Sequence, residues 1–166
     1  MKKLILLILI IPLISFGQKE EEYIDSGYSK FEQNDFEGAI EDYTKAIELN
    51  PDSEAYYYRG LTKDNLEDYE GAIADLTKVT ELFPYSHLAY NNRGFSKYNL
   101  EKYKDAVADF TIAIVLNPDD DFPKGYYHRG NSKVKLKDYY GAIEDYTNAI
   151  RIDPDYLNAY NNRGLQ

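Results

Sequence analysis

Residues 125–154 read GYYHRGNSKVKLKDYYGAIEDYTNAIRIDP, and the landmark residues of this stretch recur along the whole chain. The recurring residues are Gly27, Gly60, Gly94, Gly130 and Gly164, then Ala39, Ala72, Ala106 and Ala142, then Pro51, Pro84, Pro118 and Pro154. The step from glycine to alanine is 12 residues in every copy, and so is the step from alanine to proline. Only the step from proline to the next glycine varies, so insertions fall between units. A period of this kind predicts a stack of repeated structural units.

Each unit is predicted to contain two helices. Apolar residues within a unit follow helical rather than alternating spacing, as at Tyr139, Ala142, Ile143, Tyr146, Ala149 and Ile150. In the second unit the first helix is expected over residues 53–66, and the next should begin near Asp68. Asp35, Asp68 and Asp138 are suited to cap the second helices, because their carboxylates can accept from free backbone N–H groups. Proline then ends each second helix.

The glycines and alanines predict close contact between the two helices of a unit. Glycine inside a helix costs about 0.5 to 1 kcal/mol relative to alanine, so glycines in register indicate a steric demand. We therefore expect glycine of the first helix to face alanine of the second. Tyr43, Phe110 and Tyr146 should fill the neighbouring volume.

This pattern closely resembles the tetratricopeptide repeat (TPR) family from about Lys19 to Gln166. The matching positions are an aromatic residue four before the glycine (Tyr23, Tyr56, Tyr90, Tyr126, Tyr160), the glycine, the alanine, a large residue four later (Tyr43, Leu76, Phe110, Tyr146), a further small residue (Ala46, Val79, Ala113, Ala149) and the proline. The resemblance implies an all-α fold, a right-handed superhelix of antiparallel helix pairs. It divides the chain into units at residues 20–52, 53–85, 86–121 and 122–155, with the first helix of a fifth unit at 156–166.

The chain departs from the family at two positions of each first helix. Lysine replaces the usual tyrosine at Lys30, Lys63, Lys97 and Lys133, where we expect the stems to cover the interface while the charges stay in water. Arg59, Arg93, Arg129 and Arg163 precede the glycine in every unit that has a predecessor, and the second helices carry matching aspartates at Asp42, Asp75, Asp109 and Asp145. The pattern predicts that each arginine clamps the aspartate of the unit before it. The alternative is that both side chains are solvated.

In the TPR family the first helices line a concave groove. The resemblance places in this groove Tyr28, Tyr57, Leu61, Asp64, Asn91, Phe95, Tyr98, Tyr127 and Asn131. Tyrosine and asparagine give rigid apolar area and adjustable hydrogen bonds, which suit an extended peptide or a partner helix. Individual aromatics could instead be covered by the next unit. The lysines with which family members grip a C-terminal carboxylate are missing, and the nearest substitutes are Lys124 and Lys135 in one unit.

The amino-acid composition disfavours several classes of function. The net charge of −10 disfavours nucleic acid and anionic lipid as partners and favours a partner with a basic patch. The chain has no cysteine, and its two histidines have no partner at metal-ligand spacing, so we expect no metal and no cofactor. The Asp119–Asp121 run is interpreted as a solvated loop rather than a calcium site. With no convergent acids, bases or nucleophiles, the sequence predicts a protein that is not an enzyme.

The first 17 residues are predicted to be a signal peptide. Lys2 and Lys3 precede an apolar run to Ile14, and small residues, Ser15 and Gly17, stand at positions −3 and −1 of a cut after Gly17. The run is too short for a membrane span and Pro12 interrupts it. The mature chain would be the repeat array of residues 18–166, exported to the periplasm or the exterior of a bacterial cell envelope. We therefore interpret the protein as an exported TPR scaffold that binds a protein or peptide partner.

Two alternatives stay open. In one, the aromatics of the groove stack on sugar rings, which would make the protein a glycan- or peptidoglycan-binding module. In the other, the chain is a truncated targeting part of a larger envelope protein, because residues 161–166 end two residues past the last glycine, Gly164, without the polar cap that repeat arrays need. The uncapped end is also a candidate surface for self-association.

Overall fold

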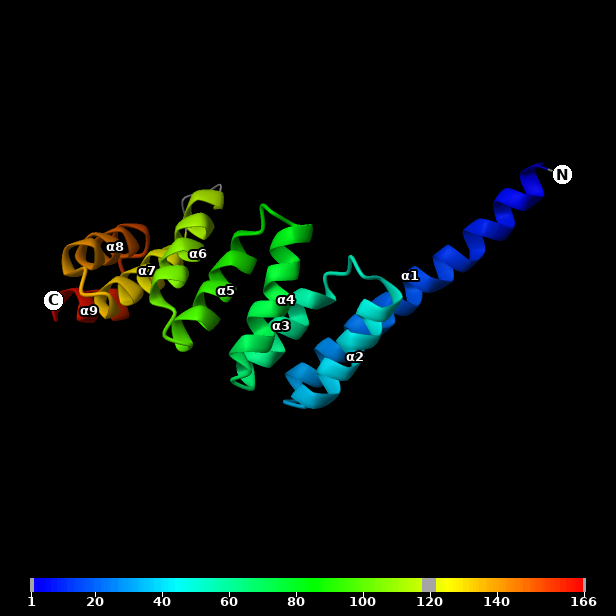
Figure 1. Ribbon diagram of the computed structural model, residues 1–166, viewed down its shortest axis with the longest axis horizontal. Helices are drawn as coiled ribbons and strands as arrows, with labels where there is room; N and C mark the ends of the chain where they lie inside the picture. The colour runs from blue at the N-terminus through cyan, green and yellow to red at the C-terminus, as the bar shows by residue number, and fades with distance from the viewer. Residues whose placement is uncertain (1, 118–121, 166) are drawn as a thin grey trace. The chain divides into compact units, whose positions relative to one another are not determined.

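The computed structural model describes residues 2–117 and 122–165, and within these ranges the chain forms helices and no strands (Figure 1). The helices are α1 (Lys2–Glu32), α2 (Phe36–Leu49), α3 (Ala55–Asn65), α4 (Tyr69–Leu82), α5 (His87–Asn99), α6 (Tyr103–Leu116), α7 (Pro123–Lys135), α8 (Tyr139–Ile152) and α9 (Leu157–Gly164). The expected all-α fold is confirmed. Helix α1 is continuous across the predicted cut after Gly17, and the signal peptide stays a prediction. In the described ranges, no helix is both long enough and apolar enough to cross a membrane.

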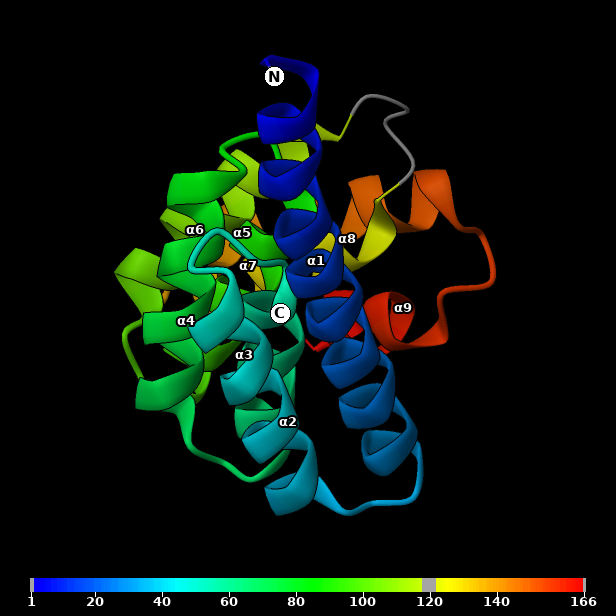
Figure 2. The ribbon, with the colours of Figure 1, turned by 90° about the vertical axis from the view of Figure 1, so that its right-hand side faces the viewer.

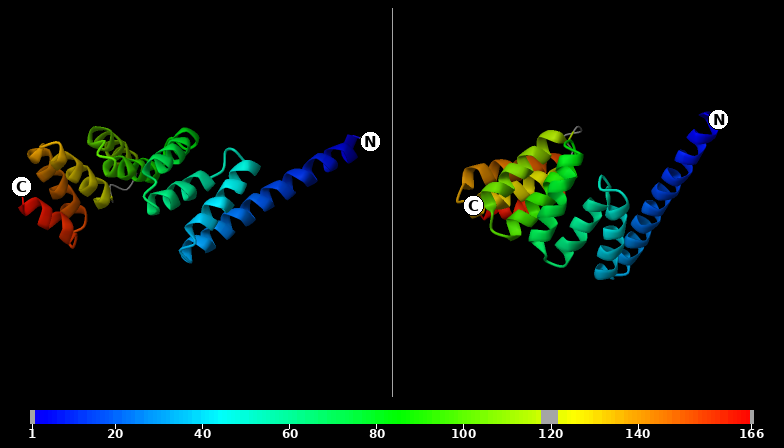
Figure 3. Two further views of the ribbon diagram at one scale, coloured as in Figure 1. Left: turned by 60° about the horizontal axis from the view of Figure 1, so that its bottom comes forward. Right: turned by 45° about the vertical axis from the view of Figure 1, so that its right-hand side comes forward.

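The chain divides after Asp75, inside α4, into two compact parts that we call the N-terminal body and the C-terminal body. In the N-terminal body α1 packs against α2, and α2 packs against α3 (Figures 2 and 3). In the C-terminal body the packing runs from α5 to α6, α7, α8 and α9 in chain order (Figure 1). Neighbours in sequence are therefore neighbours in space, as expected for helical hairpins.

The turn inside each hairpin has the same backbone form. One residue adopts a left-handed conformation, with φ between 58° and 64°, at Asn34, Glu67, Glu101 and Lys137. The carboxylate of Asp35 then accepts a hydrogen bond from the Gly38 backbone N–H at 3.0 Å, and Asp68 and Asp138 do the same for Gly71 and Gly141. The three predicted N-caps are confirmed. In the third unit Lys102 stands at the cap position and makes no such bond.

A two-residue change is expected to give the third unit the missing cap. At Gly141 an added Cβ would lie 2.4 Å from Asp138 Oδ2, so glycine three residues after the aspartate leaves the carboxylate room for this cap. Lys102→Asp together with Asp105→Gly should raise the free energy of unfolding by about 1 kcal/mol. Urea denaturation would measure the gain. The single change Lys102→Asp is the control and should gain less, because Asp105 keeps its side chain; equal effects from both variants would contradict the steric argument.

The cores of the two bodies lie between the helices of each hairpin. In the N-terminal body Ala39, Tyr43, Ala46 and Ala55 are buried, and in the C-terminal body Ala142, Tyr146, Ala149 and Ala159 form the matching cluster. Small residues at these positions allow the helices to approach, and one large ring in each cluster, Tyr43 or Tyr146, fills the remaining space.

Candidate functional site

A buried aspartate in the second helix anchors the first helix of its own unit. The side chain of Asp109 is 4% exposed and accepts from Arg93 Nε at 2.8 Å and from Arg93 Nη2 at 2.8 Å. Arg59 grips Asp75 in the same bidentate way, and Arg129 grips Asp145. Burial makes these pairs unlike exposed surface pairs, because neither charge retains full hydration.

Each of these arginines pairs with the aspartate of its own unit. This pairing corrects the sequence prediction, in which each arginine was expected to pair with the aspartate of the preceding unit. Asp42, the expected partner of Arg59, accepts instead from Ser26 Oγ at 2.7 Å and pairs with Lys30 at 2.6 Å. Asp145, the expected partner of Arg163, is held by Arg129. The arginine side chain crosses its own hairpin, so the second helix of the same unit supplies the nearest carboxylate.

The lysines four residues further along also point to these aspartates, which corrects the expectation that their charges stay in water. Lys97 Nζ lies 2.7 Å from Asp109 Oδ2, and Lys63 and Lys133 each lie 2.8 Å from their aspartates. Each of these aspartates therefore forms ion pairs with two cations. Asp42 has a lysine pair instead, and although burial by itself would raise its pKa, hydrogen bonds from Lys30, Ser26 and Lys45 outweigh it and lower the pKa to about 2.

The arginines do link successive units, but through threonine. Arg93 Nη1 donates to Thr77 Oγ1 at 3.2 Å and to Thr80 Oγ1 at 2.9 Å, both on the second helix of the preceding unit. The same contact joins Arg59 to Thr44, Arg129 to Thr111 and Arg163 to Thr147. A tyrosine three residues earlier lies under each guanidinium at 5.2–5.5 Å, as Tyr90 does under Arg93. Hydrogen bonds and ring contact together fix the arginine head.

The glycines face aromatic rings. A Cβ added at Gly94 would lie 2.9 Å from the Phe110 ring, and one at Gly130 would lie 2.7 Å from Tyr146. Gly27 meets Tyr43 in the same way. The expected partner was alanine, with the ring beside it; the structure shows that the ring itself occupies the notch that glycine leaves.

In the N-terminal body the predicted groove residues differ in exposure. Tyr28 is 53% exposed, whereas Tyr57, Leu61 and Asp64 are half-buried. Tyr57 also packs edge to face on Tyr58 at 5.7 Å. Tyr28 lies on α1, and the other three residues lie on α3. The surface that these four side chains form is therefore partly apolar and partly polar, and it is not a continuous aromatic surface.

In the C-terminal body the predicted groove residues divide into open and closed positions. Phe95 is exposed, and Tyr98, Tyr127 and Asn131 are half-buried. Asn91 is only 8% exposed, and its Oδ1 atom is buried without a hydrogen-bond donor. The prediction that Asn91 lies on the open groove is therefore wrong, because its side chain is buried.

Two of these first-helix residues, Tyr98 and Asn131, line one pocket of about 230 Å³. We call it the tyrosine–asparagine pocket; it is lined by Tyr98, Asn131, Val134, Lys135, Tyr146 and Asn162. Tyr98 and Asn131 were expected in the groove from the sequence. Tyr146 was not, because its position in the repeat predicts a core residue, and Asn162 was not, because it is adjacent to a predicted groove residue in the sequence. Tyr146 reaches the pocket because its hydroxyl extends past the buried ring.

Hydrogen bonds between the lining residues hold the pocket in shape. The Tyr146 hydroxyl donates to Asn131 Oδ1 at 2.8 Å, and Asn162 Nδ2 donates to the same oxygen at 2.9 Å. Burial raises the pKa of Tyr146 to about 12, although its hydrogen bond with Asn162 opposes this. Burial likewise raises the pKa of Tyr98, against the nearby charge of Lys135. Both phenols are therefore neutral at physiological pH and can donate or accept hydrogen bonds.

His128, on α7, is surrounded by three aromatic rings. Its ring stacks on Phe110 at 5.7 Å with an interplanar angle of 21°, and it makes T-shaped contacts with Phe95 and Tyr127 at 5.5 Å and 5.4 Å. Burial lowers its pKa to about 4, with a smaller contribution from the charge of Lys124. The imidazole is thus neutral near pH 7 and acts as a packing ring.

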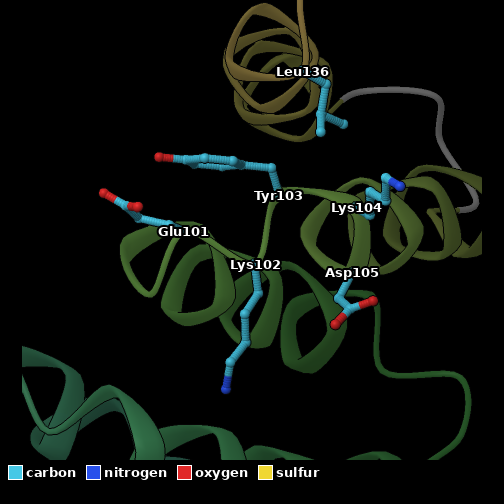
Figure 4. A pocket seen from close by; sticks show the side chains of 6 residues that line it. All are labelled: Glu101, Lys102, Tyr103, Lys104, Asp105 and Leu136. Atoms are coloured by element: carbon cyan, nitrogen blue, oxygen red, sulfur yellow. The ribbon is translucent and has the colours of Figure 1, made fainter.

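A second hollow, of about 350 Å³, lies at the turn between α5 and α6. Tyr103 lies across it beneath Leu136, while Lys102 and Lys104 point in different directions (Figure 4). Its charges do not converge on one point, so it lacks the arrangement that catalysis requires. Among residues 2–117 and 122–165, no three histidine, aspartate or glutamate side chains are placed to hold a metal. The Asp119–Asp121 run lies outside the described residues.

Sequence comparison agrees with the repeat geometry. Models described as TPR repeat or tetratricopeptide repeat match residues 27–62, 53–85 and 123–156, together more than half of the chain. The chain belongs to the tetratricopeptide repeat family. Among curated proteins, no sequence matches it.

Solved structures share the TPR fold of this chain. A crystal structure of MamA matches with a TM-score of 0.84 and 29% identity, over 90% of this chain and 81% of that one. The TPR domain of Arabidopsis OM64 matches with a TM-score of 0.61 and 29% identity, over 73% and 93% of the two chains. The second TPR domain of human RPAP3, solved in complex with an HSP70 peptide, matches with a TM-score of 0.63 and 24% identity, over 66% and 90%.

Proposed function

We propose that this TPR protein is an exported, non-enzymatic scaffold whose first-helix face binds a peptide or a partner helix. The tyrosine–asparagine pocket carries the proposal. It combines the ring of Tyr98, the methyl groups of Val134 and the amides of Asn131 and Asn162 in about 230 Å³. Such a pocket takes one apolar side chain and offers hydrogen bonds to the backbone next to it.

The net charge of the chain predicts a second property of the partner. The chain carries −10, and removal of residues 1–17 with their two lysines would make it −12. A field of this sign speeds encounter with a partner that has a basic patch. Lys135, at the pocket itself, is a local exception and suits a carbonyl or carboxylate oxygen of the bound segment.

Export rests on the first 17 residues, whose order of charge, apolar run and small residues is that of a signal peptide. The location that follows is the periplasm or the exterior of a bacterial cell envelope. Fractionation of cells that express the full chain, with mass determination of the N-terminus, tests this. A cytoplasmic protein that retains residues 1–17 would refute it.

We place peptide binding ahead of glycan binding because of ring packing. A sugar needs an open aromatic face. Tyr127 packs against the rings of His128, Tyr146 and Tyr156 at 5.3–6.1 Å, and Tyr98 packs against Tyr103 at 5.4 Å. These contacts leave less of each ring free to stack on a sugar.

Site-specific photo-crosslinking tests the binding face. A photoreactive phenylalanine analogue at position 98 should capture a partner from cell-envelope extract. The same analogue at position 140 is the matched control, because Tyr140 is 91% exposed on α8 and lies outside the pocket. We expect capture at position 98 to exceed capture at 140 at least about tenfold, and to fall as salt is raised.

A double change separates binding from chance proximity. Asn131→Ala with Asn162→Ala removes the amides that hold the pocket, and it should reduce capture at position 98 at least about fivefold, in line with the loss of about 1 kcal/mol for a hydrogen bond. Equal capture at positions 98 and 140, unaffected by this double change, would refute the proposed face.

A further inference from the structure

The outer face of α6 is apolar at positions where the other second helices carry charged and polar residues. Three exposed residues of this face, which we call the α6 stripe, are Ala108, Ile112 and Val115. Their spacing puts them in one line along two turns of the helix. The residues at the same positions of the other units are Glu41, Lys45 and Glu48 on α2, Ala74, Lys78 and Glu81 on α4, and Glu144, Asn148 and Arg151 on α8.

The α6 stripe adds a second apolar side to a helix that already has one. Helix α6 packs against α5 and α7 (Figure 1), and Ala106, Phe110 and Ala113 on its inner side are buried. On the outer side Ile112 is 39% exposed and Val115 is 77% exposed. Apolar residues all round are typical of a helix that is covered on every side. The charged residues of the other units show that the repeat itself does not require apolar residues here.

The beginning of α6 also departs from the repeat, in its charge. The other second helices begin after an aspartate cap, at Asp35, Asp68 and Asp138, whereas α6 begins after Lys102. Two residues later, Lys104 stands where α2 and α4 have glutamate. Positive charge at the N-terminus of a helix opposes the helix dipole. These two lysines therefore weaken their own helix, and their charges suit a group outside it.

The stripe and the lysines together are complementary to a second α6 that runs in the opposite direction. Such a pair has a two-fold axis, so each contact occurs twice. When the axis passes between Thr111 and Ile112, the small Ala108 lies opposite the larger Val115 of the second copy. In the same register Lys104 lies just past the end of the other α6, where free backbone carbonyls attract a positive charge. The chain thus supplies both halves of the contact.

We propose that the outer face of α6 is the interface of a homodimer in which the two α6 helices pack antiparallel. A single pair of short helices buries less than the roughly 800 Å² per partner of a standard interface, so we expect a weak dimer with a Kd of about 10 to 100 μM. Each copy carries a net charge of −10, so raising the salt concentration should strengthen the dimer. The α6 stripe is separate from the tyrosine–asparagine pocket, and the proposal does not depend on the proposed function.

Analytical ultracentrifugation of the full chain measures the dimer. Ile112→Lys with Val115→Glu gives α6 the residues that α4 has at these positions and leaves the net charge unchanged. It should raise the Kd at least about hundredfold, because both changes occur twice in the interface. The matched control, Lys78→Glu with Glu81→Lys, alters the same positions of α4 at constant net charge and should leave the Kd unchanged. All these proteins keep residues 1–17, so association through that apolar run would not separate them.

Cysteine crosslinking tests the direction of the two helices, because the chain has no cysteine of its own. After mild oxidation, a mixture of Ala108→Cys and Val115→Cys proteins should form a disulfide-linked dimer. Ala108→Cys alone should not, because the antiparallel register separates the two copies of this residue by about 10 Å along the helix axis. Crosslinking of Ala108→Cys to itself, without the mixed product, would show parallel helices and overturn the proposal.

Two further results would overturn it. A chain that stays monomeric up to about 1 mM leaves the face to a different protein. A dimer that Ile112→Lys with Val115→Glu does not weaken has its interface on another part of the chain. Far-UV circular dichroism of this variant should match the wild type, since α4 folds with the same two residues. If the variant loses helicity, the crosslinking result decides, because Ala108→Cys and Val115→Cys add no charge.

Discussion

Asp109→Asn is expected to destabilise the C-terminal body by about 3 to 5 kcal/mol, the cost of leaving buried charge without its partner. The carboxylate of Asp109 receives both guanidinium nitrogens of Arg93 at 2.8 Å and the ammonium of Lys97 at 2.7 Å. Asparagine keeps the shape but removes the charge, so two cations would face each other at the centre of the hairpin. Urea denaturation at neutral pH measures the loss.

The matched control for this prediction is Asp155→Asn, an exposed aspartate of the same body. Its effect should be within about 0.5 kcal/mol of zero. Replacing Arg93 by methionine in the Asp109→Asn background should recover part of the loss, because it removes one unmatched cation. A loss below about 1 kcal/mol for Asp109→Asn would mean that solvent reaches the group and that the pair is of the weak, surface kind.

The helices and their caps could be predicted from the sequence because local chemistry decides them. Proline ends a helix through its own ring, and Asp138 caps one through an N–H three residues away. The partner of each arginine could not be predicted in this way. Arg59 lies 17 residues after Asp42 and 16 before Asp75, so spacing hardly separates the two choices, and only the direction of the side chain decides.

One signal in the sequence would have found the role of the lysines. Lys63, Lys97 and Lys133 each follow an arginine by four residues, which puts both side chains on one face of the helix. If the arginine reaches a buried aspartate, the lysine one turn later lies within reach of it too. The expectation that these lysines are solvated did not take into account the arginine four residues before each of them.

The binding face could be predicted only in part. Tyr98 and Asn131, which the family resemblance assigns to the groove, both line a pocket in the structure, because the helix periodicity decides which side of α5 and α7 they occupy. The resemblance fails at Asn91, which is buried, and it omits Tyr146 and Asn162. Whether a side chain on the groove face of a helix is exposed to solvent depends on the rotamers of its neighbours, which cannot be deduced from the helical periodicity of the sequence.

Acidification is expected to weaken the C-terminal body through His128, by about 2.5 kcal/mol at pH 4.5 relative to pH 7.5. Enclosure by the rings of Phe110, Phe95 and Tyr127 lowers the pKa of His128 from 6.5 to about 4. Between these values the unfolded chain binds a proton that the folded chain does not, so stability falls as pH falls. Above pH 6.5 both states are neutral at this residue and the contribution is constant.

The chain itself supplies the matched variant. Tyr58 occupies the position of His128 in the second unit and stacks on Tyr43 at 5.8 Å and 21°, the arrangement that His128 has with Phe110. His128→Tyr should therefore preserve the packing but lose the dependence on pH. Urea denaturation of both proteins from pH 7.5 to 4.5 stays above the range in which Asp42, with a pKa of about 2, takes up its proton. Parallel stability curves for the two proteins would show that the imidazole is hydrated when folded, against the enclosure that its three ring contacts describe.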